Sequence, residues 1–332
     1  MRATTDSAVF RPDLGVAVME YVEGATMGLI GLEVFPIFKT PKNSSTFSVI
    51  PKEALLKLQD TARAPRGGYN RGDFPYERGK YITSEQGWEE PIDDTERALF
   101  DQEAPGMADF IATNRAMGII MKGQEKRIAD KLFNASNFTA NSITHEWDDS
   151  ANAVPINDVN TGITAFRIQC GMLPDALVIA YSTFMDLRVC DQIIDQLKYT
   201  FPGIDLNNMT SMQLAQLFGV PRVLVGGAVY DAAGKGIDSS ISDIWSNEYA
   251  ALVKISSGPD LTQPGVGRTF VWTEDSAENP IVEQYREEAI RSDVYRVRHN
   301  VDERLIQSID TSEAVKSNVA AACVYLFDNI TT

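Results

Sequence analysis

The chain has 332 residues, of which 44% are hydrophobic and 23% charged, so its composition is that of an ordinary globular protein with material for one large or two modest cores. Its 46 acidic and 30 basic side chains give a formal charge of -16, which argues against a nucleic-acid binder that works by neutralising phosphates. No apolar run has the length of a membrane span or the form of a secretory signal, which predicts a cytosolic product with no membrane partner.

Residues 1–44 are apolar but are interrupted by glycines and a proline. A helix would be weakened at each of these positions, so the segment suits an arm laid over a surface better than a free-standing helix bundle. The interrupting residues are Gly15, Gly24, Gly28, Gly31 and Pro36.

Residues 45–95 predict a long β-hairpin. A strand-like pattern begins at STFSVIP, 45–51, and returns at KYITSEQGWEEPIDD, 80–94, with a glycine-rich, charged tip between the two limbs. Residues 63–94 combine twelve charged residues with five aromatic ones. A linker would not expose so many aromatic side chains, and a core segment would not hold so many charges. We therefore expect an extended loop that packs against something other than its own body.

Residues 96–154 begin with a long amphipathic helix. Spacings of seven and four place five apolar side chains on one stripe, with charged side chains between them. Gly118 and Gly123 weaken this helix, so a kink or a close packing contact is expected there. The polar segment 134–155 then predicts a domain boundary. The stripe consists of Phe110, Met117, Met121, Ile128 and Leu132.

Residues 155–275 have the pattern of a compact α/β domain. Ala176–Ala180 is a predicted buried strand, and residues 183–199 predict one helix that opens with Thr183 and Asp186 at capping-box spacing. A second helix, SMQLAQLFG, ends at Gly219, a residue suited to a C-terminal cap. Further strands are predicted in VPRVLVGGAVYDA, EYAALVKIS and RTFVWTE.

Residues 276–332 contain two more predicted strands. Val294, Arg296 and Arg298 alternate with Tyr295 and Val297, and SNVAAACVYLFDNI predicts a final buried strand. Because that strand would lie inside a sheet, its truncation should be costly.

The sequence offers little catalytic chemistry. The two histidines, His145 and His299, lie in no metal or hydrolase motif, and the glycine clusters lack phosphate-loop spacing. The segment THEWDD, 144–149, has side chains that could bind a cation. We interpret it as a solvent-exposed connection between domains, because metal sites need ligands that converge from separate elements. We predict no catalytic residue, metal or cofactor. The three cysteines, which have no CxxC spacing, are predicted to be buried free thiols in a reducing compartment. They are Cys170, Cys190 and Cys323.

The order of these features resembles that of the major capsid proteins of tailed bacteriophages. The likeness is carried by LPDALVIAYSTFMDLRVCDQI, by SMQLAQLFGVPRVLVGGAVYDAAGKG and by the tail DVYRVRHNVDERLIQSIDTSEAVKSNVAAACVYLFDNI, and it spans essentially the whole chain. It implies an α+β fold with an N-terminal arm, an extended β-hairpin loop, a peripheral domain with a long spine helix, and an axial α/β domain. The implied divisions are the arm (1–44), the loop (45–95), the peripheral domain (96–154 and 276–332, the latter with the closing strands) and the axial domain (155–275).

The resemblance also implies that the loop lies across a neighbouring subunit, where its aromatic side chains would be buried and its charges would pair. Basic residues precede acidic ones along the loop, an order that would let identical copies meet head to tail in a closed ring. For each aromatic residue, packing within its own subunit is the alternative. The inter-subunit contact candidates are Arg63, Arg66, Tyr69, Arg71, Phe74, Tyr76, Arg78, Lys80, Tyr81, Trp88, Glu89 and Glu90.

The implied function is structural, with no catalysis: copies assemble into the hexamers and pentamers of an icosahedral phage head around double-stranded DNA. The location would be the virion capsid, after assembly in the host bacterial cytoplasm. An acidic shell would confine DNA without attracting phosphate, so DNA would be a partner only by non-specific proximity. The absence of a long charged helical segment at the start suggests a separate scaffolding protein or a chain in mature form, and a portal and a decoration protein are further partners.

Two alternatives stay open from the sequence. The same fold could build a bacterial nanocompartment shell of the encapsulin type around a protein cargo. From another class, the α/β domain could belong to an enzyme, although no cleft with convergent polar groups can be identified.

Overall fold

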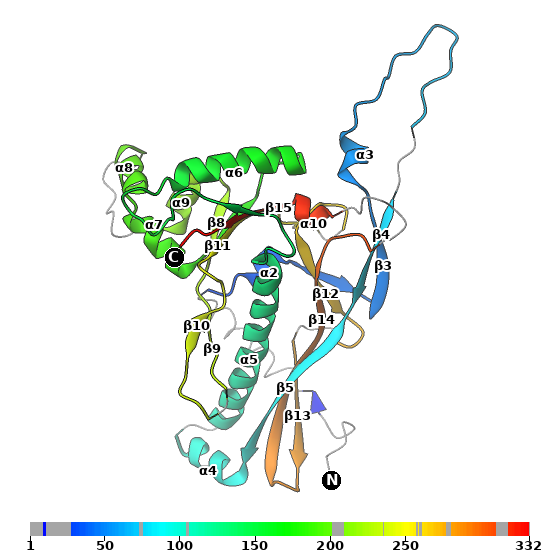
Figure 1. Cartoon of the computed structure of the whole chain (residues 1–332). Helices are drawn as coiled ribbons and strands as arrows, with labels where there is room; N and C mark the ends of the chain where they lie inside the picture. Colours follow the sequence, from blue (N-terminus) through cyan, green and yellow to red (C-terminus); the bar gives the residue numbers. More distant parts are fainter. Residues whose placement is uncertain are drawn as a thin grey trace.

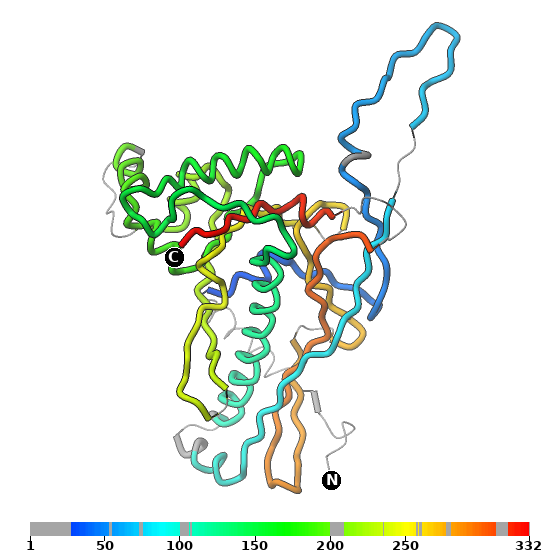
Figure 2. Tube along the Cα trace, viewed as in Figure 1, coloured from blue at the N-terminus to red at the C-terminus, as the bar shows by residue number. Residues whose placement is uncertain are grey.

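The computed structural model describes residues 9–10, 28–72, 76–103, 106–200, 209–234, 236–256, 258, 261–276, 280–309 and 318–331. Two sheets of six and five strands form the body, a long helix runs beside them, and a loop projects away from the body (Figures 1 and 2). No helix in the part of the chain so described is long and apolar enough to cross a membrane.

The six-stranded sheet is organised around one long strand, β14 (Ser292–Leu305). One edge of β14 pairs antiparallel with β13 and then with β12, and its other edge pairs antiparallel with β5 over ten residues. Strand β2 lies within the arm and pairs parallel with β12. The alternation predicted from Val294 to Arg298 is confirmed. The remaining strands are β1 (Val9–Phe10), β2 (Ile37–Thr40), β5 (Ser84–Asp93), β12 (Gly267–Trp272) and β13 (Ile281–Glu287).

Helix α5 (Met107–Leu132) confirms the predicted long amphipathic helix, and α4 (Asp94–Glu103) precedes it. Most of the predicted stripe is correct, because Met117, Ile128 and Leu132 are buried. The prediction is wrong for Phe110, which is 43% exposed near the start of the helix. Ala108 and Ala112 pack on the sheet there instead. Small residues at these positions let the helix lie close to the strands.

The five-stranded sheet has the order β6-β15-β11-β7-β8. Its inner strands β7 and β11 carry no charged residue because both faces of the sheet are covered. Leu177 and Ile179 of β7 point into one hydrophobic cluster with Phe166 and Leu214 of the helices, and the alternate residues, such as Val178, point into a second cluster. The strands are β6 (Ala140–Ser142), β7 (Ala176–Ala180), β8 (Arg222–Gly226), β11 (Tyr249–Val253) and β15 (Val324–Asp328).

The prediction for residues 183–199 is wrong in two respects. The segment forms two helices, because Cys190 has an extended backbone between them. The capping box does not form: the first helix begins at Tyr181, and the Thr183 hydroxyl donates to the backbone carbonyl of Asn247. The C-terminal cap at Gly219 is confirmed, with φ of 68°. The helices of this layer are α6 (Pro155–Cys170), α7 (Tyr181–Val189), α8 (Asp191–Thr200) and α9 (Ser211–Phe218).

Strands β12 and β15 connect the implied divisions of the chain. Strand β12, within the segment 155–275, belongs to the six-stranded sheet, and β15, within 276–332, lies between β11 and β6 in the other sheet. Each sheet therefore contains strands from more than one of these divisions. The smaller elements are α2 (Gly31–Val34), α10 (Val319–Ala322) and the hairpin of β9 (Val229–Asp231) with β10 (Ile241–Asp243).

Candidate assembly surface

The predicted hairpin forms at its base. Strand β3 (Ser44–Val49) pairs antiparallel with β4 (Glu77–Ile82), and Phe47 lies opposite Gly79. Because Gly79 has no side chain, the Phe47 ring lies over its backbone: a Cβ on Gly79 would lie 2.3 Å from that ring. The ring of Phe270 in β12 stacks on Tyr81 at 4.3 Å between centroids and on Phe47 at 5.9 Å. These contacts fix the hairpin base to the six-stranded sheet.

Beyond this base, residues 50–72 project from the body, and we call them the finger (Figure 1). The short helix α3 (Lys52–Leu56) lies at its root, where the Lys52 ammonium donates to the backbone carbonyl of Gln169 at 2.7 Å. Farther out, Leu58 is 98% exposed and Tyr69 is 76% exposed. Large apolar side chains with this exposure lose the burial energy that they would gain against a partner.

The finger carries an excess of positive charge. Residues 57–72 contain four basic side chains, Lys57, Arg63, Arg66 and Arg71, and one acidic side chain, Asp60. The Arg63 guanidinium lies 4.6 Å from the centroid of the Tyr69 ring and donates to the backbone carbonyl of Gly67 at 2.7 Å. The side-chain amide of Asn70 donates to the backbone carbonyl of Asp60 at 2.8 Å and so ties the two limbs together.

The acidic half of the predicted loop lies elsewhere. Strand β5 leaves the hairpin and joins β14, where Glu89 accepts from Arg296 at 2.7 Å and Glu90 lies 3.1 Å from Arg115. Trp88 is 45% exposed and donates its indole N–H to Glu90. The structure therefore corrects the single-loop arrangement: the basic and acidic halves belong to different elements. An open groove of about 780 Å³ beside this strand is lined by Glu85, Gly87, Trp88, Glu89, Asp275, Arg296 and Arg298.

The sequence-predicted contact residues thus fall into three groups. On the finger and at its end, Arg63, Arg66, Tyr69, Arg71 and Tyr76 are exposed, and Phe74 lies outside the described residues. On β4, Arg78 and Lys80 are exposed, whereas Tyr81 is buried in its own subunit and its hydroxyl hydrogen-bonds that of Thr40 at 2.7 Å. On β5, Trp88 and Glu89 are exposed and Glu90 is half-buried.

A buried carboxylate that the sequence did not signal joins the arm to the body. Glu125 of α5 accepts from the backbone N–H groups of Ile30 and Gly31, both at 2.8 Å, and from the indole N–H of Trp245 at 2.7 Å. Burial raises the pKa of this carboxyl, and the three donors oppose that rise. In the sequence, Glu125 looked like one of the charged residues between the apolar positions of the helix. Its partners lie in distant segments, so no local pattern reveals it.

We found no cluster of three or more metal-ligating side chains among the described residues. The surface features that stand out are instead the exposed finger and the groove beside β5.

Similarity to known proteins indicates which class of protein has this architecture. No model of a known protein family matches the chain. The chain is 28% identical over 280 residues to the major capsid protein of Burkholderia phage BcepMu, and the match covers 80% of this chain and 86% of that protein.

Two solved structures have a similar fold. The crystal structure of a phage-related protein from Bordetella bronchiseptica matches with a TM-score of 0.69 and 21% identity, over 97% of this chain and 98% of that one. The crystal structure of a virus-like particle from Pyrococcus furiosus matches with a TM-score of 0.54 and 13% identity, over 96% of this chain and 99% of that one.

The two sheets, the long helix α5 and the projecting finger therefore form the fold of phage capsid proteins. Together with the match to the BcepMu protein, this fold supports a major capsid protein of a tailed phage, a structural protein of the capsid shell.

Proposed function

We propose that copies of this chain assemble into hexamers and pentamers of a closed icosahedral head, and that the finger of each copy lies on a neighbouring copy. The observation that carries this proposal is the exposure of the finger. Leu58 and Tyr69 extend into solvent from a segment that projects away from its own body. Burial of each such side chain would contribute roughly 1.5–3 kcal/mol to the free energy of association, which favours docking of the finger on another copy.

Charge supports the same proposal. The finger is basic while the whole chain has a formal charge of -16, so the rest of the surface is strongly acidic. Opposite charge on finger and body favours contact between copies in a defined orientation. Glu89 and Glu90 are already paired with arginines of their own subunit. We therefore assign the attraction to the general acidity of the neighbouring body. Glu85 is the most exposed carboxylate beside the groove, with 60% of its side chain accessible, although it also lies 3.8 Å from Arg298 of its own subunit.

The finer parts of the function rest on the resemblance to the capsid family and on the charge of the chain. We propose that the head encloses double-stranded DNA, that an acidic subunit contacts this DNA only by non-specific proximity, and that assembly takes place in the host bacterial cytoplasm. A separate scaffolding protein, a portal and a decoration protein are the proposed partners, and no catalysis is proposed.

The test is a charge reversal in the finger, Arg66→Glu combined with Arg71→Glu. Both side chains are exposed, so the subunit should keep its thermal stability while shell formation falls at least tenfold. Negative-stain electron microscopy and analytical ultracentrifugation would measure the yield of closed shells from cells that also express a scaffolding candidate.

A control with the same charge change separates the finger from net charge. Arg167→Glu with Lys198→Glu alters two exposed side chains on α6 and α8. Shells from this control and none from the finger variant would support the proposal. Normal shells from the finger variant would refute the finger contact. Shells that contain a protein cargo instead of DNA would favour the nanocompartment alternative.

A further inference from the structure

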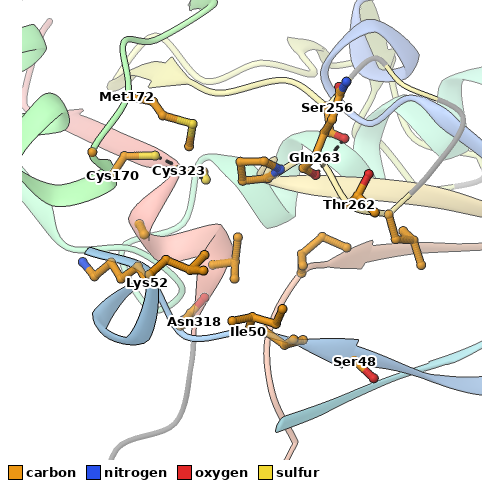
Figure 3. A pocket seen from close by; sticks show the side chains of 18 of the residues that line it. Ser48, Ile50, Lys52, Cys170, Met172, Ser256, Thr262, Gln263, Asn318 and Cys323 are labelled. Carbon is orange, nitrogen blue, oxygen red and sulfur yellow. Dashed lines mark hydrogen bonds between the residues drawn. The ribbon is translucent and has the colours of Figure 1, made fainter. Parts of the chain in front are cut away.

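Two of the three cysteines meet in the wall of a cavity. The sulfurs of Cys170 and Cys323 lie 3.6 Å apart, although the residues are 153 positions apart in the sequence (Figure 3). Both side chains are free thiols, as predicted, and both are buried. Cys170 is the last residue of α6, and Cys323 lies between α10 and β15. The pair therefore joins the helical layer to an inner strand of the five-stranded sheet.

The cavity gives this pair access to small molecules. It has a volume of about 780 Å³, and both cysteines line it together with Met172, Lys52 and residues of the finger root such as Leu56. A water molecule occupies about 30 Å³ in the liquid, so a molecule of similar size could enter and move freely. Figure 3 shows the two sulfurs beside this space, close to Met172.

We infer that Cys170 and Cys323 form a redox-active pair, which a peroxide entering the cavity converts to a disulfide within the subunit. The sulfurs are already in contact, and a disulfide requires them to approach to about 2.0 Å. The third cysteine, Cys190, is buried apart from the pair, with its sulfur 3.8 Å from the backbone carbonyl oxygen of Ala153.

The reaction balances with hydrogen peroxide as the oxidant. The Cys170 thiol gives up its proton and its thiolate attacks one peroxide oxygen. The O–O bond breaks, Cys170 becomes a sulfenic acid, and the hydroxide that leaves takes up the proton to form water. The Cys323 sulfur then attacks the Cys170 sulfur, the S–O bond breaks, and the hydroxyl leaves with the Cys323 proton as the second water. In sum, two thiols and one peroxide give one disulfide and two waters.

Cys170 is the attacking thiol in this scheme. A hydrogen bond from the Cys323 thiol lowers the pKa of Cys170, and the backbone N–H of Met172 adds to this effect. The same hydrogen bond, with burial, raises the pKa of Cys323, which keeps its proton until the second step.

The test uses the purified full-length chain, and it gives the same answer whether or not the subunits form shells. After exposure to hydrogen peroxide, the protein is denatured, alkylated with iodoacetamide and analysed by mass spectrometry and non-reducing peptide mapping. We expect the wild type to lose two hydrogen atoms, to take up two alkyl groups fewer than the reduced protein, and to yield a peptide that joins Cys170 to Cys323. The Tm should rise by roughly 5 °C or more, and dithiothreitol should reverse the rise.

Cysteine variants make the assignment specific. Cys190→Ser should behave as the wild type does, whereas Cys170→Ser and Cys323→Ser should each lose the disulfide. Three alkylated cysteines after peroxide treatment of the wild type would overturn the inference, as would oxidation to sulfinic acid without a crosslink or a disulfide that involves Cys190. The wild-type peptide map decides the question even if a serine variant fails to fold.

Discussion

The indole N–H of Trp245 donates to a carboxylate oxygen of Glu125 at 2.7 Å, and the backbone N–H of Ile30 donates to the same oxygen at 2.8 Å. Three segments distant in sequence thus meet at one buried side chain: the start of α2, the long helix α5 and the turn that follows β10. The carboxylate replaces water for donors that would otherwise be buried unpaired. It therefore fixes the start of α2 to the long helix α5.

Glu125→Ala should lower the free energy of unfolding by on the order of 3 kcal/mol or more, because it leaves three N–H donors without their acceptor. Glu125→Gln should cost less, since the amide oxygen can still accept from Ile30 and Trp245. Urea denaturation followed by circular dichroism measures both. Glu33→Ala, at a half-exposed carboxylate of α2, is the control. A cost below about 0.5 kcal/mol for Glu125→Ala would show that the arm is held by other contacts.

Gly79→Ala tests the aromatic base of the hairpin. An added Cβ would lie 2.3 Å from the Phe47 ring, so the ring must leave its place beside Phe270. We expect a loss of about 1–3 kcal/mol of stability and a change in the near-ultraviolet circular dichroism of the aromatic residues. Gly68→Ala in the finger is the matched control, because nothing lies within 4 Å of a Cβ there. Equal stability of the two variants would contradict the packing role of Gly79.

His299 should make the subunit less stable in mild acid. Burial lowers its pKa to about 4, helped by the charge of Arg127 and opposed by Glu303. Between pH 6.5 and 4 the unfolded chain therefore binds a proton that the folded chain does not. The free energy of unfolding falls as the pH drops through this window, by about 3 kcal/mol from this residue.

The measurement compares the pH dependence of urea unfolding in the wild type and in His299→Gln. The variant should have a flatter profile between pH 6.5 and 4, whatever its stability at pH 7. His145→Gln, at the other histidine, which is exposed, is the control for the loss of an imidazole. Parallel profiles for the wild type and His299→Gln would mean that other groups cause the acid sensitivity.

Local sequence patterns predicted the helices and strands better than they predicted which strands pair with one another. The period of the apolar residues was enough for α5 and β7, because a helix or strand buried on a known face shows that period directly. The partner of β5 was missed, because alternation reveals a strand but does not say which strand it pairs with. For the same reason the alternation did not show to which sheet β12 and β15 belong.

The candidate surface was predictable in part. The unusual mixture of aromatic residues, glycines and charges marked the finger, and Tyr69 is exposed as that reasoning expects. Tyr81 is also a tyrosine among glycines and charged residues, yet it is buried against Phe270. Tyr81 is buried because it contacts a residue nearly 190 positions away, and the composition of a segment cannot reveal such a contact.

The placement of β15 has a consequence for how the subunit is made. This strand fills the space between β11 and β6, so both are open edges until residues 324–328 have been synthesised. The nascent chain must hold the helices and the other strands together while a central ladder is missing, and only then can the sheet close. A chain that lacked residues 324–328 would thus expose unpaired strand edges, which favours aggregation and degradation.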